Sequence, residues 1–182
     1  METEGGRLVL VVVAGPQASG KSTLAAALGA DLRRRGERVA VVELDQVAAM
    51  ALPTLPGWDV AHRIFETVTG MWATADLTCV IAEGSGSREE VSALLRQAPQ
   101  AAVVTVAITA PFDVALARAQ ADPTRGVSKE RDFLSRVYAS WPRELDALAP
   151  DVVIDTDALT VSEGTDRIRA AIDAARRQHP TQ

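Results

Sequence analysis

The sequence has a single cysteine and few aromatic residues, and both scarcities exclude whole classes of site. Cys79 stands alone among 182 residues, so neither an internal disulfide nor a multi-cysteine metal site can form. Aromatic residues make up 4%, too few for the stacking surfaces that hold single-stranded nucleic acid. Lys and Arg total 19 against 24 Asp and Glu, and a net charge of -5 disfavours sequence-independent binding to DNA or RNA. We therefore expect no nucleic acid as a partner.

Long apolar runs are also missing. The strongest run, LVLVVVA at residues 8–14, is too short to cross a bilayer. It leads into a glycine loop rather than a cleavage site, so we expect no signal peptide, no membrane partner and a cytoplasmic location. A hydrophobic content of 47% is enough to bury a core, and the length suits one domain over residues 1–182.

Short apolar segments alternate with longer amphipathic segments along the chain. The apolar segments predict strands at residues 8–14, 39–44, 79–82, 102–109 and 152–155. The amphipathic segments predict helices at 22–35, 46–50, 59–73, 87–97, 113–121, 130–140 and 162–177, with a further short helix starting at Pro142. In the helix over 59–73 we expect Ile64, Val68 and Met71 to face inward, and we expect the tail at about 178–182 to fray. Five strands separated by helices predict an α/β fold with a parallel sheet and helices on both faces.

Residues 15–23, GPQASGKST, match the pattern G-x-x-x-x-G-K-[ST] between a predicted strand and a predicted helix. The glycines let successive backbone N–H groups point at phosphate oxygens, and the helix N-terminus adds further donors. Lys21 would reach the β- and γ-phosphates, and the Ser22 hydroxyl would coordinate Mg²⁺. The alternative is a glycine-rich turn that contains a lysine by chance, although the chain has only two lysines. The predicted phosphate-binding residues are Gly15, Ala18, Ser19, Gly20, Lys21, Ser22 and Thr23.

With this loop the chain resembles the P-loop kinases of small molecules, which include shikimate, gluconate, adenylylsulfate and nucleoside monophosphate kinases. Within that group it is most similar to the chloramphenicol phosphotransferase-like and zeta-toxin-like small kinases. The resemblance extends over nearly the whole chain. It implies a P-loop NTPase three-layer sandwich with strand order 2-3-1-4-5. It also implies ATP and Mg²⁺ as cofactors and a hydroxylated small molecule as the acceptor.

Two carboxylates follow predicted strands at the edge where open parallel sheets bind ligands. Asp45 matches the place where these kinases carry an acid facing the acceptor hydroxyl, which implies that it orients the hydroxyl and accepts its proton. It could instead cap the short helix at 46–50. Glu83 resembles a Walker B ending with Glu in place of the usual Asp. It could act on the Mg²⁺ side, contact the acceptor, or anchor the loop before Ser87 and Glu90, which form a possible capping box.

Arginines at about residues 118–131 resemble the short lid that closes over the phosphates in these kinases. The resemblance implies that Arg118 packs on adenine and that Arg125, with Arg131 as a further candidate, contacts the phosphates. Guanidinium groups there would neutralise charge on the transferred phosphoryl group. A solvated helix end with surface arginines is the alternative. Arg63 could bind an anionic acceptor or simply lie on the surface.

The acceptor itself is not specified by any motif. We expect its pocket between Asp45 and Trp72 and around residues 83–87. We expect Trp58 to pack in the core or an interface, and we assign no role to the isolated His62. Two other functions stay open: a nucleoside or nucleotide kinase, and a P-loop switch or accessory protein. A regulatory GTPase would carry an Asn-Lys-x-Asp motif, which the sequence lacks.

Overall fold

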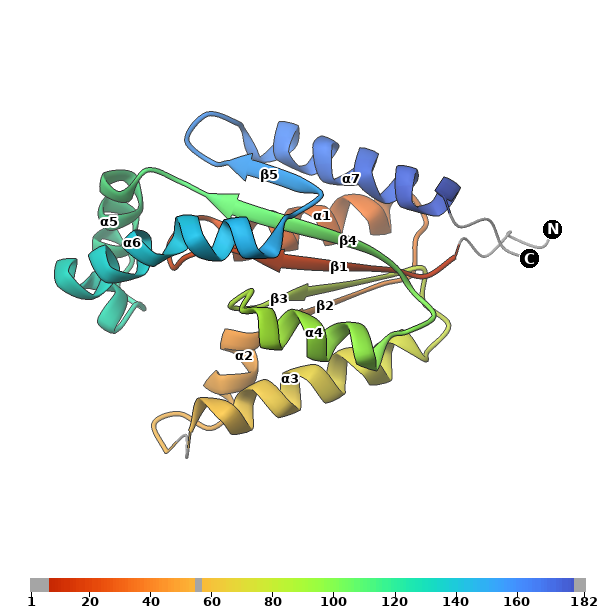
Figure 1. Ribbon diagram of the computed structural model, residues 1–182, viewed down its shortest axis with the longest axis horizontal. Coiled ribbons are helices and arrows are strands. Elements are labelled where there is room, and N and C mark those ends of the chain that lie inside the picture. The colour runs from red at the N-terminus through yellow and green to blue at the C-terminus, as the bar shows by residue number, and fades with distance from the viewer. Residues whose placement is uncertain (1–6, 55–56, 179–182) are drawn as a thin grey trace.

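The sheet has five parallel strands in the order β2-β3-β1-β4-β5, which confirms the predicted order (Figure 1). The computed structural model describes residues 7–54 and 57–178, so most of the predicted frayed tail lies outside the described residues. Val13 of β1 and Glu43 of β2 both lie in register with Glu83 of β3, so three strands end at one edge. The strands are β1 (Val9–Ala14), β2 (Val39–Glu43), β3 (Cys79–Glu83), β4 (Ala102–Thr109) and β5 (Val152–Asp155).

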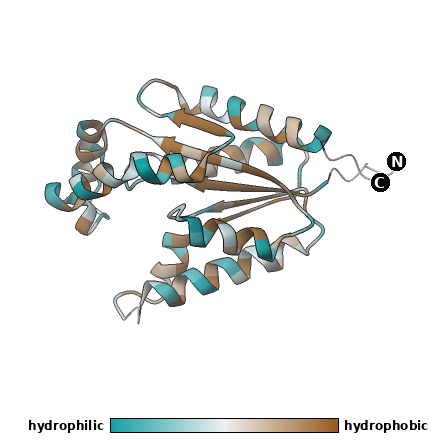
Figure 2. Ribbon diagram, in the orientation of Figure 1, coloured by the Kyte–Doolittle hydropathy of each residue, from teal (hydrophilic) through white to brown (hydrophobic). Residues whose placement is uncertain are grey.

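Helices cover both faces of this sheet. Figure 1 shows α1 (Lys21–Arg34) and α7 (Val161–Gln178) on one face, and α3 (Trp58–Ala73) and α4 (Arg88–Gln97) on the other. Successive residues of a strand point to opposite faces, so β1 must be apolar at every position and all six of its residues are buried. Figure 2 shows the result as hydrophobic strands between helices with polar outer faces. The predicted three-layer fold class is confirmed.

The remaining helices lie near the carboxyl ends of the strands. They are α2 (Leu44–Ala49), α5 (Phe112–Ala121), the short 3₁₀ helix η1 (Val127–Lys129) and α6 (Arg131–Leu148). Within the described ranges, no helix combines the length and the apolar character that crossing a membrane requires.

One helix boundary was predicted wrongly, because α6 continues through Pro142 instead of ending before it. An internal proline removes a helical hydrogen bond and costs about 3 kcal/mol. Trp141 is buried against Ala14 and Ala107, and Leu145 and Leu148 pack in the same cluster. Because these apolar side chains lie on both sides of the proline, their burial holds the helix together across it.

The inward face of α3 was also predicted wrongly in part. Ile64 and Met71 are 46% and 67% exposed, whereas Phe65 and Ala61 are buried. Val68 does pack against the core, as predicted. Apolar residues of α3 lie on two neighbouring faces. The face with Ala61 and Phe65 is buried, and the face with Ile64 and Met71 is exposed. The apolar spacing alone could not distinguish the two faces.

Candidate functional site

The loop between β1 and α1 curls around a space lined by backbone. Gly15 and Gly20 have φ values of 156° and 101°, and Ala18 also has a positive φ of 61°. A Cβ atom on Gly15 would lie 2.3 Å from the carbonyl oxygen of Ile108, so no other residue fits there without a shift. The buried Ser19 hydroxyl has no hydrogen-bond partner among the described residues. This geometry fits a bound phosphate group.

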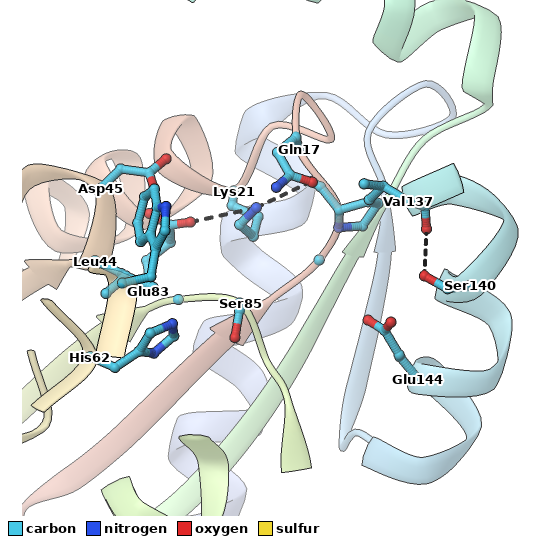
Figure 3. A pocket seen from close by; sticks show the side chains of 14 residues that line it. Gln17, Lys21, Leu44, Asp45, His62, Glu83, Ser85, Val137, Ser140 and Glu144 are labelled. Atoms are coloured by element: carbon cyan, nitrogen blue, oxygen red, sulfur yellow. Dashed lines mark hydrogen bonds and ion pairs between the residues drawn. The ribbon is translucent and has the colours of Figure 1, made fainter. Parts of the chain in front are cut away.

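Lys21 folds back over the loop. Its Nζ donates to the carbonyl oxygen of Pro16 at 3.1 Å and lies 3.7 Å from Oε1 of Glu83 (Figure 3). Burial lowers the pKa of Lys21, and the Glu83 carboxylate opposes that shift. The ammonium is therefore held out of bulk water next to a carboxylate, in a place where a phosphate could take over as its partner.

Glu83 ends β3 on the other side of the lysine. Its Oε2 accepts a hydrogen bond from the Ser22 hydroxyl at 3.3 Å, and its side chain is 4% exposed. Burial raises the pKa of Glu83 to about 7, although Lys21 acts in the opposite direction. The structure thus brings together Ser22 and Glu83, the two residues predicted to lie at the Mg²⁺ site. No group of three or more His, Cys, Asp or Glu that could hold a metal gathers within residues 7–54 and 57–178, so a metal here would also need ligand oxygens.

The raised pKa of Glu83 makes stability depend on pH. From pH 4.5 to about 7 the folded protein keeps a proton that the unfolded chain has released, so stability falls as pH rises through this window. In metal-free buffer we expect Glu83→Gln to gain about 3 kcal/mol of unfolding free energy relative to wild type between pH 4 and pH 8. Urea unfolding at both pH values measures this gain. The same substitution at exposed Glu89 is the control, and an equal gain there would contradict the assignment.

Asp45 lies in the first turn of α2 but does not cap it. The N-cap residue is Glu43, and no side chain makes the capping hydrogen bond. The alternative that Asp45 caps the short helix is therefore wrong. Its exposed carboxylate faces the phosphate loop instead, and it lines two adjoining hollows.

Three hollows surround the phosphate loop: the phosphate cradle, the Arg118 hollow and the main cavity. The phosphate cradle is lined by Gln17, Ala18, Gly20, Lys21, Ser22, Thr23, Asp45, Glu83 and Arg125. The Arg118 hollow, about 230 Å³, is lined by Gly20, Thr23, Leu24, Arg118, Thr156, Leu159, Thr160 and Val161. The main cavity, about 350 Å³, is lined by Gly15, Pro16, Gln17, Lys21, Leu44, Asp45, Trp58, His62, Glu83, Gly84, Ser85, Val137, Ser140 and Glu144. The cradle shares Lys21, Asp45 and Glu83 with the main cavity, so the two are continuous.

The predicted arginines take different positions. Arg118 donates to Oγ1 and to the carbonyl oxygen of Thr156 at 2.7 and 3.1 Å, which fixes it in the Arg118 hollow. Arg125 lines the cradle and pairs with Asp122 at 3.3 Å. Arg131 lies over the Phe112 ring and lines none of the three hollows. Arg63 is exposed in a separate hollow on α3 and is not brought to the site.

Residues without a motif complete the main cavity. Ser87 caps α4 as predicted, but the buried Glu90 carboxylate accepts from Ser85 and from the Gly86 N–H instead of returning to Ser87. Nδ1 of His62 lies 3.0 Å from Oε2 of Glu90, so the pair anchors an imidazole in the cavity. The capping pattern was the only sequence signal for Glu90.

Trp58 and Glu144 also line the cavity; Trp58 lies in the segment where the acceptor pocket was expected, whereas Glu144 was not predicted there. Trp58 is 53% exposed and lies at the start of α3, so the expectation that it packs in the core is wrong. Glu144 comes from α6, on the opposite side of the cavity from α2. No sequence signal marked Glu144, because its role depends only on where α6 packs.

Several solved structures of similar fold are kinases by title. A shikimate kinase from Bacteroides thetaiotaomicron has a TM-score of 0.63 at 16% identity, covering 91% of this chain and 98% of that one. A sugar kinase from Janibacter sp. HTCC2649 has a TM-score of 0.62 at 22% identity, covering 96% and 99%. A gluconokinase from Sinorhizobium meliloti 1021 has a TM-score of 0.63 at 17% identity, covering 92% and 93%. At these identities the likeness establishes the fold alone.

No curated protein matches the chain. A family model, described as the CobQ/CobB/MinD/ParA nucleotide binding domain, matches residues 10–179. This match runs from β1 past the end of α7 and includes the phosphate loop. The chain therefore belongs to the CobQ/CobB/MinD/ParA nucleotide-binding domain family.

Proposed function

We propose that the protein transfers the γ-phosphoryl group of ATP to a hydroxyl group of a small molecule. The observation that carries this proposal is the main cavity, which opens directly beside the phosphate cradle and shares Lys21, Asp45 and Glu83 with it. A transferase needs room for a second substrate at the phosphate end of the nucleotide, whereas nucleotide hydrolysis needs room only for water. A volume of about 350 Å³ lies at the small end of ligand sites.

Each part of the site has a task in this proposal. Lys21 would neutralise the β- and γ-phosphates, and Ser22 with Glu83 would hold Mg²⁺, directly or through water. Bound Mg²⁺ would supply a divalent charge that offsets the phosphate oxygens. The Arg118 hollow would receive the base, and Arg125 would meet the charge that develops on the transferred group.

Asp45 would act on the acceptor. The acceptor oxygen forms a bond to the γ-phosphorus while the bond from that phosphorus to the β,γ-bridging oxygen breaks, so that ADP leaves. The hydroxyl proton passes to the Asp45 carboxylate. Because Asp45 lines both the cradle and the main cavity, its carboxylate lies where the two substrates would meet.

Two alternatives lead to different results. Membership in a nucleotide-binding domain family also suits a switch that acts on a protein partner. A nucleoside or nucleotide kinase would use the same cradle with a different acceptor. ATP turnover with and without a panel of hydroxylated metabolites and antibiotics, including chloramphenicol and nucleosides, separates them. Strong stimulation by one compound, with its phosphorylated product detected, supports the kinase; stimulation by a protein only would support the switch.

The two lid arginines should differ in their kinetic effects. We expect Arg125→Ala to lower kcat by about 10²-fold with little change in the KM for ATP, because its charge acts in the transition state. Arg118→Ala should mainly raise the KM for ATP, since this arginine is bound in the hollow beside Thr156. Steady-state kinetics of both variants measure the difference. Arg131→Ala is the control, and an equal effect of all three would contradict the assignment.

A further inference from the structure

The charges that line the main cavity do not balance. Three carboxylates, those of Asp45, Glu83 and Glu144, face it, and Lys21 is the one cation among the lining residues. Lys21 and Glu83 lie 3.7 Å apart and belong to the phosphate side of the cavity. Asp45 and Glu144 remain, and neither forms an ion pair with another described residue. An acceptor in the cavity would therefore meet two negative charges.

The nearby arginines do not correct this imbalance. Arg125 is paired with Asp122 at the cradle, and Arg63 lies in the separate hollow on α3. Arg88 and Arg143 line an adjoining hollow, which shares Ser85 and Glu144 with the main cavity, and neither arginine forms an ion pair with Glu144 in the described part of the chain. Neither of them lines the main cavity. A carboxylate or phosphate group on the acceptor would thus have no guanidinium partner inside the cavity.

The other polar groups offer hydrogen-bonding positions to a ligand. Nδ1 of His62 lies 3.0 Å from Oε2 of Glu90, whose carboxylate is fixed by Ser85 and Gly86, so Nε2 is the ring nitrogen left for a ligand. The Ser140 hydroxyl donates to the carbonyl oxygen of Val137, which leaves its oxygen to accept from a ligand. At the rim, the half-exposed indole of Trp58 offers an aromatic face of the kind that attracts cations.

We propose that the acceptor is a hydroxyl compound that also carries an ammonium group, as amino sugars and amino alcohols do. This inference rests on the proposed phosphotransferase function and specifies its second substrate. The ammonium group lies between Glu144 and the Trp58 side of the cavity, and the reacting hydroxyl lies at Asp45. Carboxylated and phosphorylated acceptors are rejected, because they would bring a third uncompensated negative charge into the cavity.

A matched set of acceptors tests this preference. The set is glucosamine, glucose and glucuronate, compared at constant ionic strength by binding to the protein with a non-hydrolysable ATP analogue and by transfer of label from [γ-³²P]ATP. We expect glucosamine to bind about tenfold more tightly than glucose and glucuronate to bind most weakly. Tightest binding of glucuronate, or equal binding of all three, would overturn the proposal. Binding in the expected order without transfer to any acceptor would instead refute the phosphotransferase function and leave the charge preference standing.

A second measurement needs no acceptor. In a Trp72→Phe background the emission that ions can reach comes from Trp58, because Trp141 is 4% exposed. We expect caesium to quench Trp58 more efficiently than iodide, since the two carboxylates attract cations. Glu144→Lys should reverse or abolish that difference. Asp146→Lys makes the same charge change on the same helix, away from the cavity lining, and should leave the difference in place. Stronger quenching by iodide in the Trp72→Phe protein would overturn the proposal.

Discussion

Phosphoryl transfer is expected to fall by about 10²–10³-fold or more when Lys21 is replaced by methionine. The substitution keeps an unbranched side chain that is one atom shorter, and it removes the ammonium that lies 3.7 Å from Glu83 at the centre of the site. Without that ammonium, charge on the β- and γ-phosphates is no longer neutralised, so the affinity for Mg-ATP should fall as well. Product formation and nucleotide binding by calorimetry measure both effects.

The Lys21→Met variant should still fold. Glu83 already has a pKa raised to about 7 by burial, so it can take a proton when its cationic neighbour is lost, and no uncompensated charge stays buried. The melting temperature of Lys21→Met should therefore remain near that of wild type at neutral pH. Arg33→Met, which removes an exposed positive charge at the far end of the same helix, serves as the control. Transfer at the wild-type rate by Lys21→Met would refute the phosphate-loop assignment.

The Asp45→Asn variant should bind ATP normally and yet transfer phosphate about 10²–10⁴-fold more slowly. Asparagine keeps the shape of the side chain and loses the negative charge and the ability to accept the proton. Because Asp45 does not cap α2, the exchange should cost little stability. Rates of acceptor phosphorylation, ATP binding and the melting temperature together measure this separation.

Glu43→Gln is the matched control for Asp45→Asn. Glu43 lies two residues earlier, ends β2 and lines none of the three hollows around the phosphate loop. Its replacement should leave transfer largely intact. Full activity in Asp45→Asn would exclude Asp45 as the proton acceptor, and an equal loss in both variants would point to a general effect of charge at this edge.

The sequence was sufficient for the features that depend on local pattern. The fully apolar β1 could only be a central strand, and the glycine-lysine-serine spacing located the phosphate loop. Because parallel strands end at a common edge, the closeness of Glu83 to Ser22 also followed from their positions after β3 and the loop. The proximity of Asp45 to the loop followed in the same way.

The rest depends on how distant elements pack. His62 and Glu90 come together because α3 lies against α4, and nothing near either residue marks that contact. Glu144 lies in the cavity because α6 stays helical through Pro142, and the burial of Trp141 against the sheet stabilises the helix there. Arg131 was a further candidate for contacting the phosphates, but it lies over the Phe112 ring and beside Asp113 instead. In each case a tertiary contact decides the position, and local propensity cannot reveal it.

The phosphate loop and the rest of the main cavity come from different elements of the fold, and this separation has an evolutionary consequence. The phosphate-binding part comes from β1, the loop after it and α1, where a Cβ at Gly15 would already collide with the neighbouring strand. In the proposed function, the acceptor side would come largely from side chains of α2, α3 and α6, such as Trp58, His62 and Glu144, which are half-exposed or exposed. Substitutions at these positions would place little strain on the sheet, so under the proposed function descendants of this chain could acquire new acceptors while the nucleotide half stayed unchanged.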